Sequence, residues 1–376
     1  MKPKFDFIEK KLKQLKNDNL LRKLRKTSVD KGYIIISQKK YLNLSSNDYL
    51  GINLGMINYS QMQSSSRLIS GNDSNFEKLE KLLSKHKSQE KSIVYPTGYM
   101  ANLGAITSIV TKNDFVFSDE LNHVSIIEAC KLSGAKIKIY KHNDVEDLEK
   151  KMNKTNGRKF IITEGVFSMD GDIANLKEIT NISANNDSIL ILDDAHGDFV
   201  FGRNGRGTGD ILGVNKKIDV YISSLSKGLG SFGGYISSQK SVIDLCINQS
   251  RSFIYTSALP SSIINFSIKR LNMNREKRRK KLWKNINTFH KGLENIGFAT
   301  KSSSQIIPIM IGNEKKAMDF GKFLLSKNIF AQPIRFPTVK KDNARIRISI
   351  TAWHTEKEID YVLEILEKAG RRFQII

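Results

Sequence analysis

The sequence has little cysteine, and its two cysteines, Cys130 and Cys246, lie far apart and outside any CxxC pattern. They therefore predict neither a disulfide framework nor a zinc site. Long apolar runs are also missing: no segment approaches the ~18 residues that a membrane-spanning helix needs. The first residues contain no apolar stretch of the kind that directs secretion. We expect a soluble, cytoplasmic protein without a membrane contact or a metal.

Acidic residues are outnumbered, because 61 lysines and arginines stand against 38 aspartates and glutamates, which gives a net charge of +23. Such a balance is typical of proteins that bind nucleic acids or membranes. The lysines, however, are spread along the chain among many Asn, Ile and Ser residues. We interpret the charge as a compositional bias and expect no nucleic-acid partner. A basic rim would also suit an anionic substrate.

The middle of the chain predicts a sheet. Its 376 residues exceed what one core usually organises, and a hydrophobic content of 39% is adequate for a globular protein. Short apolar strands alternate with helical segments, which is the rhythm of a mostly parallel sheet with helices on both faces. The expected strands are 92–95, 114–118, 136–140, 159–163, 189–192, 220–223 and an antiparallel 234–237. The expected helices are 76–86, 100–110, 123–132, 145–152 and 176–184.

The two ends of the chain predict a second, smaller domain. Residues 5–27 place apolar and basic residues at helical spacing and predict one amphipathic helix, followed by a hairpin. A basic helical run at roughly 261–294 leads to a final third of mixed strands and helices. We expect an N-terminal helix and hairpin (1–45) that pack with the small domain, a large domain (46–285) and a small α+β domain (286–376).

A lysine among small residues follows one of the predicted strands. Lys227 lies within Ser223–Gly230, directly after an apolar segment. Desolvation lowers the pKa of a lysine and makes the neutral amine available as a nucleophile. Lys227 is therefore a candidate for a Schiff base with a carbonyl group. A solvated lysine in a Gly/Ser loop is equally compatible with this stretch alone.

A second stretch favours the chemical interpretation. Residues 189–192 are apolar and run directly into Asp193, Asp194 and His196. Buried parallel strands have this pattern, and α/β sheets bind ligands at the carboxyl ends of such strands. A carboxylate there can pair with the pyridinium nitrogen of pyridoxal 5'-phosphate (PLP), the cofactor that acts as an electron sink. The turn at 96–99, between a strand and a helix, offers backbone N–H groups suitable for a phosphate.

Five blocks resemble the α-oxoamine synthases, which are PLP enzymes of the aspartate-aminotransferase fold type. They occur in the family's order along nearly the whole chain: Ser46–Gly51, Thr163–Gly171, Asp193–Gly197, Ser226–Gly228 and Ala344–Arg347. The resemblance implies a PLP-dependent transferase fold of type I, with a mostly parallel central sheet, helices on both faces and a small α+β C-terminal domain. Two departures bear on the substrate pocket: Ser65–Arg67 replaces a glycine-rich segment, and Phe76 stands where a histidine is frequent.

The resemblance also implies roles for single residues. Lys227 matches the lysine that holds PLP and moves protons at the substrate Cα, and Asp193 matches the carboxylate that keeps the pyridine nitrogen protonated. His196 and Ser168 match the partners of the ring hydroxyl, and His123 matches the histidine that stacks on the ring. The remaining implied cofactor contacts are Ser224, Gly98, Tyr99 and, given by the partner subunit, Thr256. A homodimer with shared active sites is therefore expected.

The implied substrate contacts are mostly arginines. Arg347 is our candidate for the amino-acid carboxylate, because a guanidinium binds it bidentately and a lysine cannot. Arg345, two residues away on the same strand face, is the alternative. Arg22 would bind the distant carboxylate of an acyl chain. Asn47 and Thr351 are further candidates for substrate binding.

Members of this family join an amino acid to an acyl group from a thioester and usually release carbon dioxide. Gln332–Val339 is similar to the P-P-T-V stretch of the members that form 8-amino-7-oxononanoate, and Phe253–Pro260 also resembles them. We therefore expect L-alanine and a pimeloyl thioester, carried by coenzyme A or a carrier protein, as substrates in biotin synthesis. The alternatives are a glycine C-acetyltransferase and a catalytically silent PLP-fold protein that binds nucleic acid through its basic surface.

Overall fold

The computed structural model describes residues 6–21, 27–52 and 65–376. The chain forms two compact units. Unit 1 contains residues 1–46, 169–171 and 281–376, and unit 2 contains residues 47–168 and 172–280. The sequence analysis put the boundaries at 45/46 and 285/286, and nothing in it indicated that residues 169–171 belong with unit 1.

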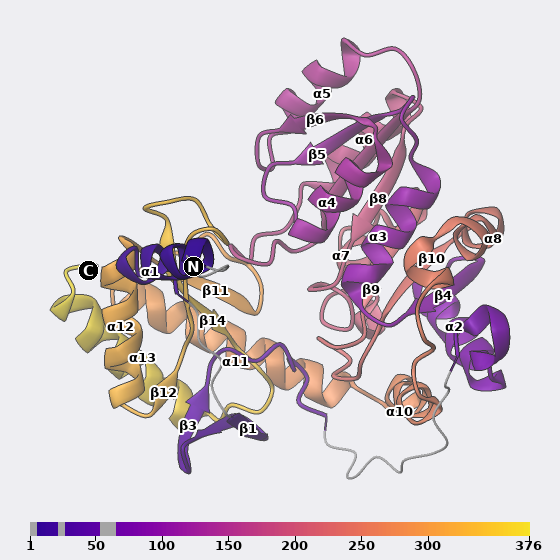
Figure 1. The fold of residues 1–376 in the computed structure, drawn as a ribbon. Helices are drawn as coiled ribbons and strands as arrows, with labels where there is room; N and C mark the ends of the chain where they lie inside the picture. The colour runs from indigo at the N-terminus through magenta and orange to yellow at the C-terminus, as the bar shows by residue number, and fades with distance from the viewer. Residues whose placement is uncertain (1–5, 22–26, 53–64) are drawn as a thin grey trace. The chain divides into compact units, whose positions relative to one another are not determined.

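Unit 2 is built on a seven-stranded sheet with the order β4-β10-β9-β8-β7-β5-β6 (Figure 1). Neighbours from β9 to β6 pair in parallel, whereas β10 is antiparallel to both of its neighbours. Every strand expected from the sequence is present, within one residue at each end. The strands are β4 (Lys91–Tyr95), β5 (Phe115–Asp119), β6 (Lys136–Tyr140), β7 (Lys159–Glu164), β8 (Ile189–Asp193), β9 (Val220–Ser224) and β10 (Gly234–Ser238).

Helices cover both faces of this sheet, because alternate side chains of each strand enter two different cores. In β8, Ile191 packs with residues of α3 (Gly98–Ile109), α4 (Val124–Ser133) and α8 (Lys240–Gln249). Leu190 and Leu192 instead pack with residues of α5 (Val145–Asn153) and α6 (Leu176–Asn185). The other helices of the unit are η1 (Arg67–Gly71), α2 (Ser74–Lys87), η2 (Arg203–Gly205), α7 (Thr208–Ile211), η3 (Asn215–Lys217), α9 (Arg251–Ile254) and α10 (Ser261–Asn272).

Unit 1 contains two small sheets. In one, the hairpin strands β1 (Thr27–Asp30), β2 (Tyr33–Ile36) and β3 (Lys39–Asn43) are joined by β12 (Ile329–Phe330), which pairs in parallel with β3. In the other, β14 (Ala344–Ser349) lies between β11 (Ile306–Gly312) and β13 (Pro333–Ile334). Helices α12 (Glu314–Ser326) and α13 (Glu356–Arg372) complete the α+β arrangement. Thr355 and Glu358 start α13 with a reciprocal capping box.

Two helix predictions outside the central sheet differ from the structure. Helix α1 (Asp6–Asn17) ends ten residues before the predicted position 27, because Asn19 adopts a left-handed conformation with φ of 55° and the Leu20 and Leu21 amides turn back to Leu15 O. The run at 261–294 is two helices, α10 and α11 (Glu276–Asn295). Between them the Asn274 side chain accepts the Glu276 N–H, a local bond that starts a new helix.

His142 holds the loop that follows β7 in place through hydrogen bonds from both ring nitrogens. Its Nδ1 lies 2.9 Å from Asp119 Oδ1 and its Nε2 lies 2.8 Å from Asp172 Oδ2. The ring also meets Phe167 edge-on at 4.3 Å between centroids. Burial by itself would lower the pKa of His142, but the hydrogen bonds to Asp119 and Asp172 raise it to about 10. Both ring nitrogens therefore donate, and the imidazolium links β5 to the loop that follows β7.

Replacing His142 with glutamine is expected to destabilise the protein in a pH-dependent way. Because the pKa of His142 is raised in the folded state, its contribution to stability is complete below the ordinary pKa of 6.5 and is lost as pH rises through about 10. Urea unfolding of wild type and His142→Gln should therefore differ most at and below pH 6.5 and least above pH 10. A difference that does not change over this range would contradict the charged imidazolium.

Candidate active site

The parallel strands of unit 2 end at one edge of the sheet, where α/β proteins bind ligands. The ends of β4, β5, β7, β8 and β9 lead into residues that the sequence analysis selected. They are Gly98 and Tyr99 after β4, His123 after β5, Ser168 after β7, Asp193 and His196 at β8, and Ser224 and Lys227 at β9. The topology thus gathers residues separated by up to 129 positions, because 227 − 98 = 129.

Lys227 is at one end of a chain of hydrogen bonds. Its Nζ lies 3.0 Å from His196 Nε2, and the Nδ1 of the same ring lies 2.7 Å from the Tyr49 hydroxyl. Tyr49 in turn donates to Asn47 Oδ1 at 3.0 Å. Tyr49 is fully buried and His196 is 5% exposed. The lysine amine therefore lies beside a buried imidazole that is held in place from its other side.

Asp193 is held by groups on two sides. Its Oδ1 accepts the Ala195 N–H at 3.0 Å, and its Oδ2 accepts the Asn102 side-chain amide at 2.6 Å. Asn102 belongs to α3 and also donates to Ser125 Oγ of α4 at 2.9 Å. These bonds fix the direction of a buried carboxylate, which can then stabilise a cation that binds beside it.

Two further ionisable groups lie near Asp193. Burial lowers the pKa of His123 below its ordinary value, and Lys227 adds to this effect while Asp193 opposes it, so the imidazole is neutral. Glu164 ends β7 and is the register partner of Asp193. Burial, followed by the charge of Asp193, raises the pKa of Glu164 well above its ordinary value. Its Oε1 is buried and has no hydrogen-bond partner among the described residues.

The first turn of α3 suits a phosphate group. Thr97 caps the helix by accepting the Met100 N–H at 3.1 Å, and the first N–H groups of a helix have no partner within it. Close packing puts this end against the sheet: a Cβ on Gly98 would lie 3.2 Å from Ser224 Cβ, and one on Gly234 would lie 2.5 Å from Gly98 N. The Ser224 and Ser226 hydroxyls, 2.8 Å apart, lie nearby.

These residues fit PLP. An amine is available for its aldehyde, a buried carboxylate for its ring nitrogen, and a helix end with serine hydroxyls for its phosphate. Besides Glu164 Oε1, Asn102 Oδ1 is buried without a hydrogen-bond partner among the described residues. Unsatisfied polar atoms are rare in protein interiors and often mark a place where a ligand binds.

A buried ionic cluster supports the Asp193–Gly197 block from behind. Lys87 Nζ lies 3.0 Å from Asp194 Oδ2 and 2.9 Å from Asp198 Oδ1, and His86 also contacts Asp198 at 2.9 Å. Burial would lower the pKa of Lys87, but Asp198 and Asp194 outweigh it and raise that pKa. For Asp194, burial dominates and raises the pKa to about 6. The cluster anchors the positions on both sides of His196.

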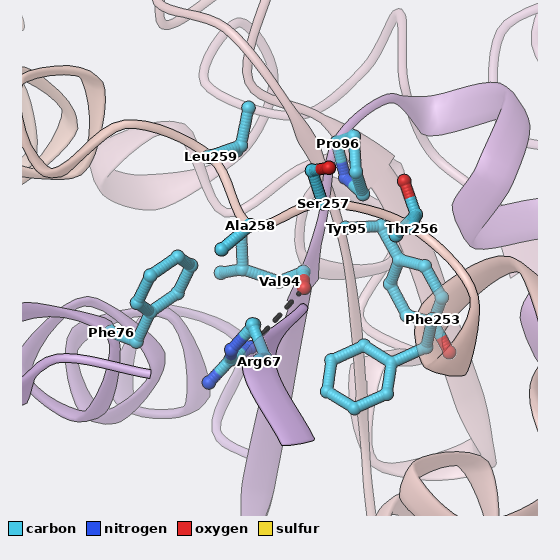
Figure 2. A pocket seen from close by; sticks show the side chains of 10 residues that line it. All are labelled: Arg67, Phe76, Val94, Tyr95, Pro96, Phe253, Thr256, Ser257, Ala258 and Leu259. Atoms are coloured by element: carbon cyan, nitrogen blue, oxygen red, sulfur yellow. Dashed lines mark hydrogen bonds between the residues drawn. The ribbon is translucent and has the colours of Figure 1, made fainter. Parts of the chain in front are cut away.

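Thr256 lies apart from these residues, in a segment that borders a small pocket (Figure 2). The Arg67 guanidinium lies 4.1 Å from the ring centroid of Phe76 and 5.2 Å from that of Phe253. It also pairs with Glu80 at 2.5 Å and donates to Val94 O at 3.3 Å. Contact of Thr256 with the cofactor of the partner subunit stays a prediction.

Tyr99 is partly exposed and donates its hydroxyl to Glu128. Its ring meets His123 edge-on, with 6.4 Å between centroids. The tyrosine thus borders His123 at the first turn of α3, as expected for a residue beside the cofactor. Its direct contact with the cofactor stays a prediction.

The predicted substrate residues Arg345, Arg347 and Thr351 belong to unit 1. Arg345 and Arg347 lie on β14, where Arg345 forms an ion pair with Asp170 and Arg347 Nη1 donates to Ser349 Oγ at 2.9 Å. A substrate carboxylate would have to displace Asp170 from Arg345, which favours Arg347. Thr351 is buried and follows β14. Arg22 lies outside the described residues.

Sequence reasoning gave no role to Tyr49, Asn102 or Glu164. Asn102 could have been found from its spacing, because it lies four residues after Gly98 and hence on the same face of a helix. Glu164 carries the same signal as Asp193, a carboxylate at the end of an apolar strand. No local pattern connects Tyr49 to His196, 147 residues away.

Comparisons with known proteins agree over the whole chain. A family model described as aminotransferase class I and II matches residues 39–366. The 8-amino-7-oxononanoate synthase of Thermoanaerobacter pseudethanolicus is 39% identical over 99% of this chain and 98% of that protein. The 8-amino-7-oxononanoate synthase 1 of Bacillus subtilis is 36% identical over 100% of both.

Solved structures show the same similarity. A serine palmitoyltransferase from S. paucimobilis, solved with PLP and myriocin, superposes with a TM-score of 0.92 at 28% identity and covers 99% of both chains. The 8-amino-7-oxononanoate synthase from Francisella tularensis gives a TM-score of 0.76 at 27% identity, over 89% of this chain and 99% of that one. Among the described residues, no helix is long and apolar enough to cross a membrane.

Proposed function

This chain belongs to the aminotransferase class I and II family, as its sequence blocks predicted, and from that premise we propose that it is a PLP-dependent acyltransferase that forms 8-amino-7-oxononanoate in biotin synthesis. The reaction joins L-alanine to a pimeloyl thioester and releases carbon dioxide and the thiol carrier. Full-length similarity to 8-amino-7-oxononanoate synthases supports this activity. The similarity of Gln332–Val339 to the P-P-T-V stretch supports it independently of the catalytic residues.

The observation that carries the proposal is the pairing of Lys227 with His196 beside a buried Asp193. Lys227 Nζ lies 3.0 Å from the imidazole, and Asp193 is 7% exposed and oriented by Asn102. With these surroundings, the lysine can bind the aldehyde of a PLP molecule, and the aspartate can pair with the ring nitrogen of the same molecule. A silent protein of this fold would have no need of either.

When bound, PLP supplies an electron sink that stabilises negative charge at the amino-acid Cα. Lys227 holds the cofactor covalently and, once released, takes the proton from Cα as a general base. Asp193 keeps the ring nitrogen protonated, and His196 and Ser168 bind the ring hydroxyl. Neutral His123 stacks on the ring. The phosphate is bound by the remaining cofactor contacts. These are Gly98 and Tyr99 in the first turn of α3, together with Ser224.

Substrate binding is assigned to residues beyond this cofactor set. Arg347 binds the alanine carboxylate through its guanidinium fork, which fixes the orientation of Cα. Asn47 and Thr351 add polar contacts, and Arg22 binds the far carboxylate of the pimeloyl chain. A homodimer completes each site, since Thr256 of the partner subunit contributes a phosphate contact. Because each site then contains residues of both subunits, activity requires the dimer.

Substrate choice is tested by titrating the PLP-loaded protein with alanine and with glycine and then adding acyl thioesters. We expect a spectral change with alanine, followed by carbon dioxide release and product formation with a pimeloyl thioester. An uncharged heptanoyl thioester should react with a higher KM, by roughly 5- to 150-fold, because it lacks a carboxylate worth about 1–3 kcal/mol in a charged hydrogen bond. Absorbance, carbon dioxide release and mass spectrometry of the product are the measurements.

Glycine with acetyl thioester is the informative comparison. A strong preference for this pair would identify a glycine C-acetyltransferase and would reject the proposed substrates while leaving PLP chemistry intact. Coenzyme A and carrier-protein forms of the pimeloyl donor, supplied in parallel, decide between the two carriers. Arg22→Ala should raise the KM for the pimeloyl donor and leave that for the heptanoyl donor unchanged.

A further inference from the structure

Tyr49 has no part in the function proposed above, yet its hydroxyl touches the imidazole that contacts Lys227. It lies 2.7 Å from His196 Nδ1 and 3.0 Å from Asn47 Oδ1, and its side chain is completely buried. A buried hydroxyl between a histidine and an amide oxygen determines which atoms carry protons, because each partner can donate or accept only in certain ways.

The proton positions follow from this geometry. The Tyr49 hydroxyl has one proton, which it donates to Asn47 Oδ1, so its oxygen accepts from His196 Nδ1–H. A neutral imidazole carries only one N–H group. His196 Nε2 therefore bears a lone pair, and this lone pair faces Lys227 Nζ at 3.0 Å. The imidazole is set to accept a proton from the lysine.

The segment that carries Tyr49 is fixed to the loop that carries Lys227. Arg270 Nη2 donates to Ile52 O at 2.6 Å, and its Nη1 donates to Leu229 O at 2.8 Å and Gly230 O at 2.6 Å. One guanidinium thus binds the main chain on both sides. Arg278 adds bonds to the carbonyls of Leu50 and Gly51, at 2.6 and 2.7 Å. The position of the Tyr49 hydroxyl relative to Lys227 is therefore defined.

We propose that Tyr49 is a positioning residue that holds His196 as the proton acceptor for Lys227 when the lysine captures PLP. The inference rests on the proposed function, since it concerns the same lysine. A lysine ammonium cannot attack an aldehyde. Its proton passes from Nζ to His196 Nε2, the amine lone pair then forms the C–N bond, and the aldehyde oxygen leaves as water with the two remaining amine protons.

The first test measures the tautomer of His196 directly. The chain has six histidines, so 15N labelling of histidine and a His196→Gln reference spectrum identify the His196 signals. Cofactor-free wild type should show the Nδ1–H form. Tyr49→Phe, which keeps the buried ring, should show the Nε2–H form once the pH is high enough to make the Lys227 amine neutral, because a lysine ammonium can only donate to Nε2. Asn47→Leu should do the same, because the Tyr49 hydroxyl then donates to Nδ1 instead.

The second test measures the rate at which cofactor-free protein captures PLP near neutral pH, followed by absorbance and by borohydride trapping. Tyr49→Phe should capture PLP about five- to tenfold more slowly, as expected for the loss of one oriented hydrogen bond. Tyr140→Phe is the matched control: it removes another buried hydroxyl, on the outermost strand β6, which β8, β7 and β5 separate from β9, and should capture PLP at the wild-type rate.

The inference is overturned if wild type shows the Nε2–H form, or if Tyr49→Phe keeps the Nδ1–H form and the wild-type capture rate. A failure of the proposed function would give different results from a failure of this inference. If wild type takes up no PLP on Lys227, the proposed chemistry is wrong, and the proposed capture role with it. If wild type takes it up and Tyr49→Phe is unchanged, only the role of Tyr49 is wrong.

Discussion

Lys227→Ala is expected to abolish covalent capture of PLP and to slow turnover by about 10²- to 10⁴-fold, the contribution of a positioned proton-transfer group. The reason is that Lys227 Nζ is the amine beside His196 at the edge of the sheet and is assigned both the covalent bond and the proton at Cα. Wild type should be yellow, and borohydride should fix PLP to Lys227. Peptide mapping by mass spectrometry locates the modified lysine.

Lys240→Ala provides a control for the loss of a lysine in the same unit. Lys240 is exposed at the start of α8, so its loss should leave the colour, the borohydride product and the turnover unchanged. Reduced PLP on a lysine other than 227 in wild type would show that the assignment is wrong. Full turnover by Lys227→Ala would show the same.

Asp193→Asn is expected to leave the fold and part of the cofactor binding intact and to reduce turnover about 10³-fold. A carboxylate 4 Å from a cation is worth about 4 kcal/mol at an effective dielectric constant of 20, which corresponds to roughly a thousandfold in rate. Asparagine can still accept the Ala195 N–H, but it carries no charge to keep the ring nitrogen protonated. Turnover and the absorbance change on adding alanine are the measurements.

Asp244→Asn is the matched substitution, because Asp244 is a partly exposed aspartate on α8 that pairs with Lys91 at 2.6 Å. It should keep wild-type turnover. Circular dichroism of both variants separates loss of fold from loss of chemistry. Near-normal turnover by Asp193→Asn, with the fold intact, would exclude the proposed role of this carboxylate.

The sequence by itself determined the central sheet and most of the proposed site. Alternating apolar strands and amphipathic helices follow local periodicity, so the seven strands of unit 2 could be predicted to within one residue. The residues at their carboxyl ends, such as Asp193 and Lys227, could be predicted for a related reason. A charge directly after an apolar strand is a local pattern, and parallel strands bring such positions to one edge.

Local patterns were insufficient where a competing interaction decided the outcome. The helix predicted for residues 5–27 ends at Asn17 because a single left-handed residue, Asn19, lets the chain turn. The inclusion of 169–171 in unit 1 also has no signal in the sequence. It depends on bonds such as that from the Ser302 hydroxyl to Gly171 O at 3.2 Å, 131 residues apart.

Only the tertiary structure decided the protonation and orientation of the reactive groups. The orientation of the His196 imidazole depends on its contact with Tyr49, 147 positions away. The direction of the Asp193 carboxylate depends on Asn102, 91 positions away. Glu164 and Asp193 both follow an apolar strand in the sequence, so the sequence does not distinguish them. They differ in the structure, where Glu164 has a buried oxygen without a hydrogen-bond partner among the described residues. The physical reason is that secondary structure follows from neighbours along the chain, whereas a pKa or a tautomer follows from neighbours in space.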